Sequence, residues 1–110
     1  MLQTLHDDLR QQLLSIDGMT SRPYSGTGQT PKGGIEEFLL RDKYFAGLRL
    51  TEKHLMLYLM PIYTLPDLNE RFAERLKPVR SGKSCLKISR PERLDREALE
   101  TILTMGAARW

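Results

Sequence analysis

The chain has 110 residues, of which 40% are hydrophobic and 28% charged, a composition that predicts one folded domain with its own core. Its single cysteine excludes an intramolecular disulfide framework and any metal site built from several thiolates. No long apolar run occurs, so we expect no membrane-spanning segment. The N-terminus also lacks the continuous apolar core of a signal peptide, and we therefore expect a cytoplasmic protein.

The formal net charge of +3 is unevenly distributed along the chain. Residues 71–96 contain nine Lys and Arg but only three Asp and Glu, a net charge of +6, whereas residues 1–70 sum to −2. Such a basic segment can attract phosphates or acidic partners through its local field. It can equally be a solvated face that keeps the protein soluble, and both interpretations stay open at this point.

The first element in chain order is an amphipathic helix over residues 2–16. Apolar residues recur three or four positions apart from Leu2 to Ile16, which places them on one helical stripe. Gly18 can supply the left-handed residue that ends such a helix. Residues 18–34 contain five glycines and two prolines, so we expect a long loop there, either mobile or functional.

Three strands joined by short turns are expected next, because the apolar period changes from that of helices to that of strands. The first strand carries Phe38 and Leu40 on one face. The second and third cover residues 43–51 and 54–63, with turns at Asp42-Lys43 and Glu52-Lys53. The third is almost continuously apolar, as a strand covered on both faces would be, and Pro61 would end it.

Two helices and one more strand complete the pattern. A helix capped by Asp67 runs to Leu76, a strand covers residues 84–89, and Asp95 caps a last helix that Gly106 closes. The resulting order is αβββαβα. Helices at both ends and a mostly antiparallel sheet predict an α+β fold, a two-layer sandwich in a single domain over residues 1–110.

Two glycine motifs are incomplete. Gly82-Lys83-Ser84 is similar to the end of a phosphate-binding P-loop, but Lys77 stands where the pattern needs glycine, and a strand follows instead of a helix. These departures argue against nucleotide hydrolysis, while Arg80, Lys83 and nearby N–H groups could still hold an anion. Gly26-Thr27-Gly28 lacks the flanking strand and helix of a dinucleotide-binding motif and indicates a turn.

No catalytic constellation can be placed on the sequence. Both histidines precede Cys85, no oxyanion turn adjoins it, and the adjacent carboxylates Asp7-Asp8 and Glu36-Glu37 point to different sides of their elements. Cys85 follows Lys83 and precedes Lys87, so it is either a thiol activated by cations or a small packing residue. We expect no catalytic residues and no cofactor, and a non-enzymatic role ranks above an enzymatic one.

Several segments resemble one known family. The run Lys53–Pro61, the helix over 68–76, Ser81–Ile88 and Asp95–Leu99 follow one another as the corresponding segments do in YdhG-like proteins, a small bacterial domain family of largely unknown function. The resemblance covers about residues 36–105 and implies an uncharacterised binding or accessory domain. The aromatic segment that family members commonly place before the first strands is replaced here by Arg22–Gly28, which puts a pocket role for it in doubt.

The leading hypothesis is a binding domain for an anionic ligand or an acidic partner. Its candidate residues are the cations Arg71, Arg75, Arg80, Lys83 and Lys87. Nucleic acid remains an open partner class, no membrane partner is expected, and the chain could act as a monomer or a homodimer.

An iron-binding alternative follows from the resemblance, since some relatives are similar to frataxins in architecture. Its candidate ligands are His6, Asp7 and Asp8. Iron favours clustered carboxylates as hard oxygen donors, and a basic chain offers few of them.

Overall fold

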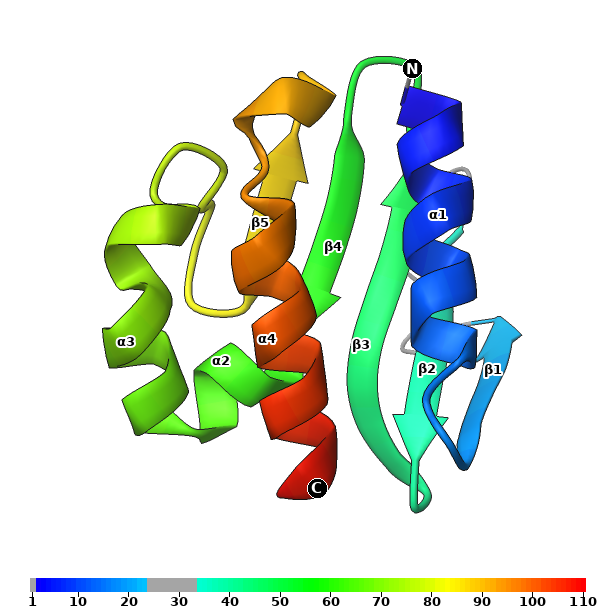
Figure 1. The fold of residues 1–110 in the computed structure, drawn as a ribbon. Coiled ribbons are helices and arrows are strands. Elements are labelled where there is room, and N and C mark those ends of the chain that lie inside the picture. The colour runs from blue at the N-terminus through cyan, green and yellow to red at the C-terminus, as the bar shows by residue number, and fades with distance from the viewer. Residues whose placement is uncertain (1, 24–33) are drawn as a thin grey trace.

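Five antiparallel strands form one sheet in sequential order in the computed structural model, which describes residues 2–23 and 34–110 (Figure 1). The strands are β1 (Met19–Pro23), β2 (Glu36–Leu40), β3 (Lys43–Leu50), β4 (Leu55–Leu59) and β5 (Cys85–Ile88). The helices are α1 (Leu2–Leu14), α2 (Met60–Thr64), α3 (Pro66–Leu76) and α4 (Arg96–Ala108), with a short 3-10 turn at Pro91–Arg93. The α+β class, with a helix at each end, is confirmed.

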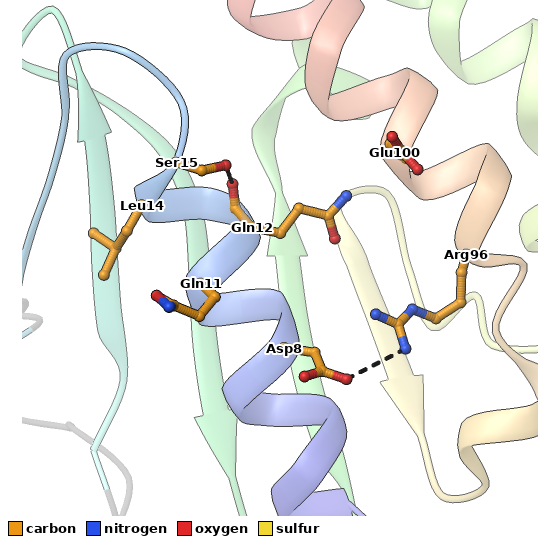
Figure 2. A pocket seen from close by; sticks show the side chains of 7 residues that line it. All are labelled: Asp8, Gln11, Gln12, Leu14, Ser15, Arg96 and Glu100. Carbon is orange, nitrogen blue, oxygen red and sulfur yellow. Dashed lines mark hydrogen bonds and ion pairs between the residues drawn. The ribbon is translucent and has the colours of Figure 1, made fainter.

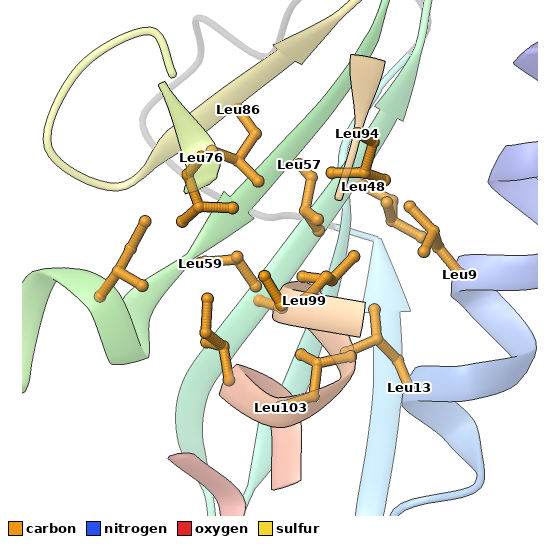
Figure 3. Packing of buried hydrophobic residues seen from close by; sticks show 14 of the residues in the cluster. Leu9, Leu13, Leu48, Leu57, Leu59, Leu76, Leu86, Leu94, Leu99 and Leu103 are labelled. Carbon is orange, nitrogen blue, oxygen red and sulfur yellow. The ribbon is translucent and has the colours of Figure 1, made fainter. Parts of the chain in front are cut away.

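Helices α1 and α4 lie on the same face of the sheet, and α3 packs beside α4 (Figure 1). Leucines from both layers meet between them, as Figure 3 shows for Leu9 and Leu13 of α1, Leu57 of β4, and Leu99 and Leu103 of α4. Alternation along β4 and β5 sends every second side chain into this core, whereas β3 buries four consecutive residues, Phe45 to Leu48. None of the helices in the described residues is long and apolar enough to cross a membrane.

Strand β1 replaces part of the loop expected over residues 18–34. Met19–Pro23 pairs antiparallel with β2, although Met19 is its only buried residue. A strand with one buried side chain lacks the alternating apolar pattern by which strands are recognised, so only the pairing reveals it. Residues 24–33, including Gly26-Thr27-Gly28, lie outside the described residues.

The apolar run predicted as one strand over residues 54–63 divides into two elements. β4 ends at Leu59, and α2 follows with Pro61 in its first turn. Proline is tolerated there because the first helical N–H groups have no partner within the helix. The chain therefore turns away from the sheet, which leaves Ile62 buried and Tyr63 exposed.

The hairpin between β2 and β3 turns one residue earlier than expected. Arg41 and Asp42 have φ values of 53° and 63°, whereas the sequence pattern suggested Asp42-Lys43. Positive φ at both central residues is typical of the type I′ turn, whose twist matches that of the strands. The Arg41 side chain also donates a hydrogen bond from Nη1 to the Ala107 carbonyl at 3.3 Å, tying the turn to α4.

Two expected helix boundaries are wrong and one is confirmed. α3 begins at Pro66 without a side-chain cap, and Asp67 instead binds Arg109 of the α4 C-cap at 2.5 Å. Gly106 lies inside α4, against Pro61, and does not end the helix. Asp95 does cap α4, because its Oδ1 accepts a hydrogen bond from the Ala98 N–H at 3.0 Å.

Candidate functional site

Two of the five predicted cations, Arg80 and Lys83, line one surface hollow, which we call the Arg80 pocket. Its volume is about 300 Å³. Its described lining residues come from α2, α3 and the turn that precedes β5: Ile62, Tyr63, Asn69, Arg80 and Lys83. Residues from position 62 to position 83 thus converge because α2 and α3 lie beside the turn that precedes β5 (Figure 1).

A small hairpin positions the two cations. Arg80 forms an isolated bridge with Leu86, and the chain then reverses at Gly82, whose φ of +117° favours glycine. The Arg80 guanidinium donates to the Gly82 carbonyl from Nε and to the Lys83 carbonyl from Nη2, each at 2.7 Å. These bonds fix the guanidinium on the turn, and three of its five N–H donors have no partner among the described residues.

The charge of the pocket is uncompensated within the described residues. No carboxylate there forms an ion pair with Arg80 or Lys83, and the partners of Arg80 are neutral carbonyls. The undescribed segment 24–33 contains no Asp or Glu. A carbonyl partner orients a guanidinium without cancelling its positive charge, so the pocket can attract an anion.

Arg71 and Arg75, which the sequence predicts as anion-binding residues, contact other side chains of the protein instead. Their guanidinium carbons lie 5.1 and 5.8 Å from the centre of the Phe72 ring, which is within cation–π range. Arg75 also binds Asp95 at 2.8 Å and Glu97 at 3.4 Å, at the start of α4. Arg75 therefore joins α3 to α4, and neighbouring carboxylates offset its charge.

The pair between Arg75 and Asp95 makes stability depend on pH in a defined direction. Hydrogen bonds, first from Arg75 and then from the Ala98 N–H, hold the pKa of Asp95 below its ordinary value of 3.8. A carboxyl group with a lowered folded-state pKa stabilises the fold above its unfolded pKa, and this stability is lost as pH falls through the folded value. Asp95→Asn keeps a good helix cap but removes the charge.

We therefore expect wild type to melt a few degrees above Asp95→Asn at pH 7, with the difference narrowing below pH 3.8. Thermal unfolding followed by circular dichroism from pH 7 to pH 2 tests this. A gap of constant size over that whole range would contradict the assigned role of the charge.

Lys87 and Cys85 lie apart from the Arg80 pocket. Both alternate with the buried Leu86 and Ile88 along β5, so they occupy the sheet face opposite the helices. Burial raises the pKa of the Cys85 thiol, and Lys87 offsets only part of that rise. A thiol whose pKa is raised is less reactive, so the structure favours a packing role over an activated nucleophile.

The three iron-ligand candidates do not converge. Asp7 accepts hydrogen bonds from Gln3 at 2.9 Å and pairs with the His6 ring at 3.1 Å, while Asp8 faces α4 and pairs with Arg96 at 3.6 Å. Across residues 2–23 and 34–110, no three His, Cys, Asp or Glu side chains are grouped to hold a metal ion. The hydrogen bonds from His6 and Gln3 lower the pKa of Asp7.

A larger hollow, of about 870 Å³, lies along the outer side of α1 and the start of α4 (Figure 2). Asp8 and Arg96 bridge the two helices, whereas Gln11 and Leu14 point away from α4. Its cation is already paired, and Glu100 adds a further negative charge. This surface is therefore less suited to an anion than the smaller Arg80 pocket.

Sequence reasoning identified the two cations of the Arg80 pocket but missed Tyr63 and Asn69. The apolar run over residues 54–63 predicts a strand that includes Tyr63, and Asn69 carries no local signal of a site. The Oδ1 atom of Asn69 is buried and accepts no hydrogen bond within the described residues. Pro61, which can start a helix as well as end a strand, was the one available sign that Tyr63 belongs to another element.

Comparisons with family models, with curated proteins and with solved structures find no significant match to this chain. The resemblance to YdhG-like proteins therefore stays a prediction from the sequence motifs.

Proposed function

We propose that this protein is a non-enzymatic binding domain that recognises an anionic group, such as a phosphate, in the Arg80 pocket. The observation that carries the proposal is the pairing of Arg80 and Lys83 in one hollow without a carboxylate partner in the described residues. A guanidinium oriented by two carbonyls is prepared for an oxyanion, because little side-chain freedom is lost when the anion binds.

The dimensions of the hollow favour a small anionic group over a broad acidic surface. A volume of about 300 Å³ lies at the lower end of the range for ligand pockets. Arg71 and Arg75 would be needed for an extended basic surface, but they are engaged with Phe72, and Arg75 also with Asp95. The proposal therefore narrows the five candidate cations to Arg80 and Lys83.

Among the described residues that line the Arg80 pocket, Tyr63 and Lys83 are of types that can transfer a proton, but no carboxylate, histidine or thiol accompanies them to complete a catalytic set. This favours binding over chemistry. The iron alternative receives no comparable support, since no three metal-ligating side chains are grouped in the described residues and Asp8 pairs with Arg96.

Titration of the ¹⁵N-labelled protein with inorganic phosphate tests the proposal. We expect saturable chemical-shift changes at the amides of residues 81–84 and of Asn69, and weaker affinity as ionic strength rises. Lys83→Gln should reduce the affinity about tenfold, the loss expected for one charge-assisted hydrogen bond.

Lys77→Gln is the matched control, because Lys77 is an exposed cation of the same basic segment that does not line the pocket. Arg80→Gln should also abolish binding, but it removes the bonds that hold the turn, so Lys83→Gln carries the comparison. Equal losses in Lys77→Gln and Lys83→Gln would indicate a diffuse charge effect and contradict a specific site.

A further inference from the structure

Tyr63 is unusual among the described residues, because it is the one large hydrophobic side chain that is strongly exposed. Its relative exposure is 54%, whereas the preceding Ile62 is 2% exposed. Successive residues of a helix point about 100° apart, so α2 buries Ile62 in the core and turns Tyr63 toward solvent. Exposure of a single aromatic residue is common on protein surfaces and means little by itself.

The residues around Tyr63 indicate that its exposed ring is part of the Arg80 pocket. The side chain lines the same hollow as Arg80 and Lys83, which form no ion pair with any carboxylate in the described part of the chain. Asn69 also lines the hollow, but its Oδ1 atom is buried and not open to it. The hollow thus offers positive charge on one wall and an exposed aromatic ring on another.

We propose that the ligand of the Arg80 pocket is a nucleoside monophosphate, an inference that rests on the anion-binding function above. Its phosphate binds Arg80 and Lys83, and its base stacks on the Tyr63 ring. A planar aromatic group beside a phosphate is the ligand chemistry that matches an aromatic ring beside two cations.

The size of the pocket is consistent with a ligand whose phosphate lies inside the hollow and whose base lies outside it. A hollow of about 300 Å³ can enclose the phosphate and part of the ribose, while the base lies over the exposed ring at its rim. The incomplete P-loop pattern around Gly82-Lys83-Ser84 is consistent with a phosphate that binds at this turn. The turn leads into β5 and not into a helix, so the phosphate is held by side chains and not by a helix N-terminus.

Three ligands of increasing complexity separate this inference from the anion-binding function: inorganic phosphate, ribose 5-phosphate and adenosine 5′-monophosphate. Binding of each to the full chain would be measured by ¹⁵N chemical-shift titration. We expect adenosine 5′-monophosphate to bind about tenfold more tightly than ribose 5-phosphate, because stacking of one base on an aromatic side chain adds affinity.

Tyr63→Leu should remove that tenfold advantage and leave the affinity for ribose 5-phosphate unchanged, whereas Tyr63→Phe should retain it. Equal affinity of the wild type for the two sugar phosphates would overturn the nucleotide assignment and leave phosphate binding intact. Absence of binding by all three ligands, inorganic phosphate included, would instead overturn the anion-binding function and the nucleotide assignment together.

Discussion

Leu57→Ala is expected to lower the free energy of unfolding by about 3 kcal/mol, within the range found for large-to-small changes in well-packed cores. Leu57 is 1% exposed in β4, which pairs with strands on both sides. Its cross-strand neighbours Leu48 and Leu86 are also buried and face the same helices (Figure 3). Because rigid strands surround the site on both sides, the cavity left by the missing carbons can close only in part.

Met56→Ala is the matched control, since Met56 precedes Leu57 in the same strand, points to the opposite sheet face and is only half-buried. We expect it to lower the free energy of unfolding by about 1 kcal/mol. Urea denaturation of both variants followed by circular dichroism measures the two values. Equal losses would mean that the helical face of the sheet is no better packed than the opposite one.

Gly106→Ala is expected to lower the free energy of unfolding by about 2 kcal/mol, although alanine is the better helix former. An added Cβ at Gly106 would lie 2.8 Å from both Cβ and Cγ of Pro61, closer than carbon atoms in contact normally approach. The proline ring is rigid and cannot rotate away, so α4 must shift from α2. Overpacking of this kind costs about 1–3 kcal/mol and must also exceed the gain of about 1 kcal/mol in helix propensity.

A double-mutant cycle isolates the contact between α4 and α2. Pro61→Gly removes both ring carbons, and in that background Gly106→Ala should become neutral or stabilising, because only the helix preference of alanine remains. The sign of the Gly106→Ala effect in the two backgrounds is therefore the readout. A loss of the same size in both would show that Pro61 is not what requires glycine at this position.

The candidate site could be predicted from the sequence only in part. A local count of charges located Arg80 and Lys83, since both lie within the segment of net charge +6. That count could not show that Arg75 is bound to Asp95, because charge compensation depends on which side chains meet. Tyr63 and Asn69 could not be predicted for the same reason, because they join the pocket only when α2 and α3 fold beside the turn that precedes β5.

Secondary structure was predicted well where a local pattern was strong. The leucine stripe of α1 and the Asp95 cap of α4 are short-range features, and both occur in the structure. The strand predicted from alternation is also present as β3, although four consecutive residues of it, Phe45 to Leu48, are buried. β1 was missed because its polar sequence is made a strand by pairing with β2. α2 was missed because a continuous apolar run is compatible with a buried strand or a buried helix.

The sequence by itself determined the α+β class, the helices at both ends and the location of the excess positive charge. These properties depend on apolar periodicity and composition, which neighbouring residues carry regardless of the rest of the chain. Tertiary structure alone decided which cations lack an ion pair in the described residues, which aromatic side chain is exposed beside them, and why Gly106 must be small. Each of these depends on distances between residues far apart in sequence, and those distances exist only once the two layers have packed.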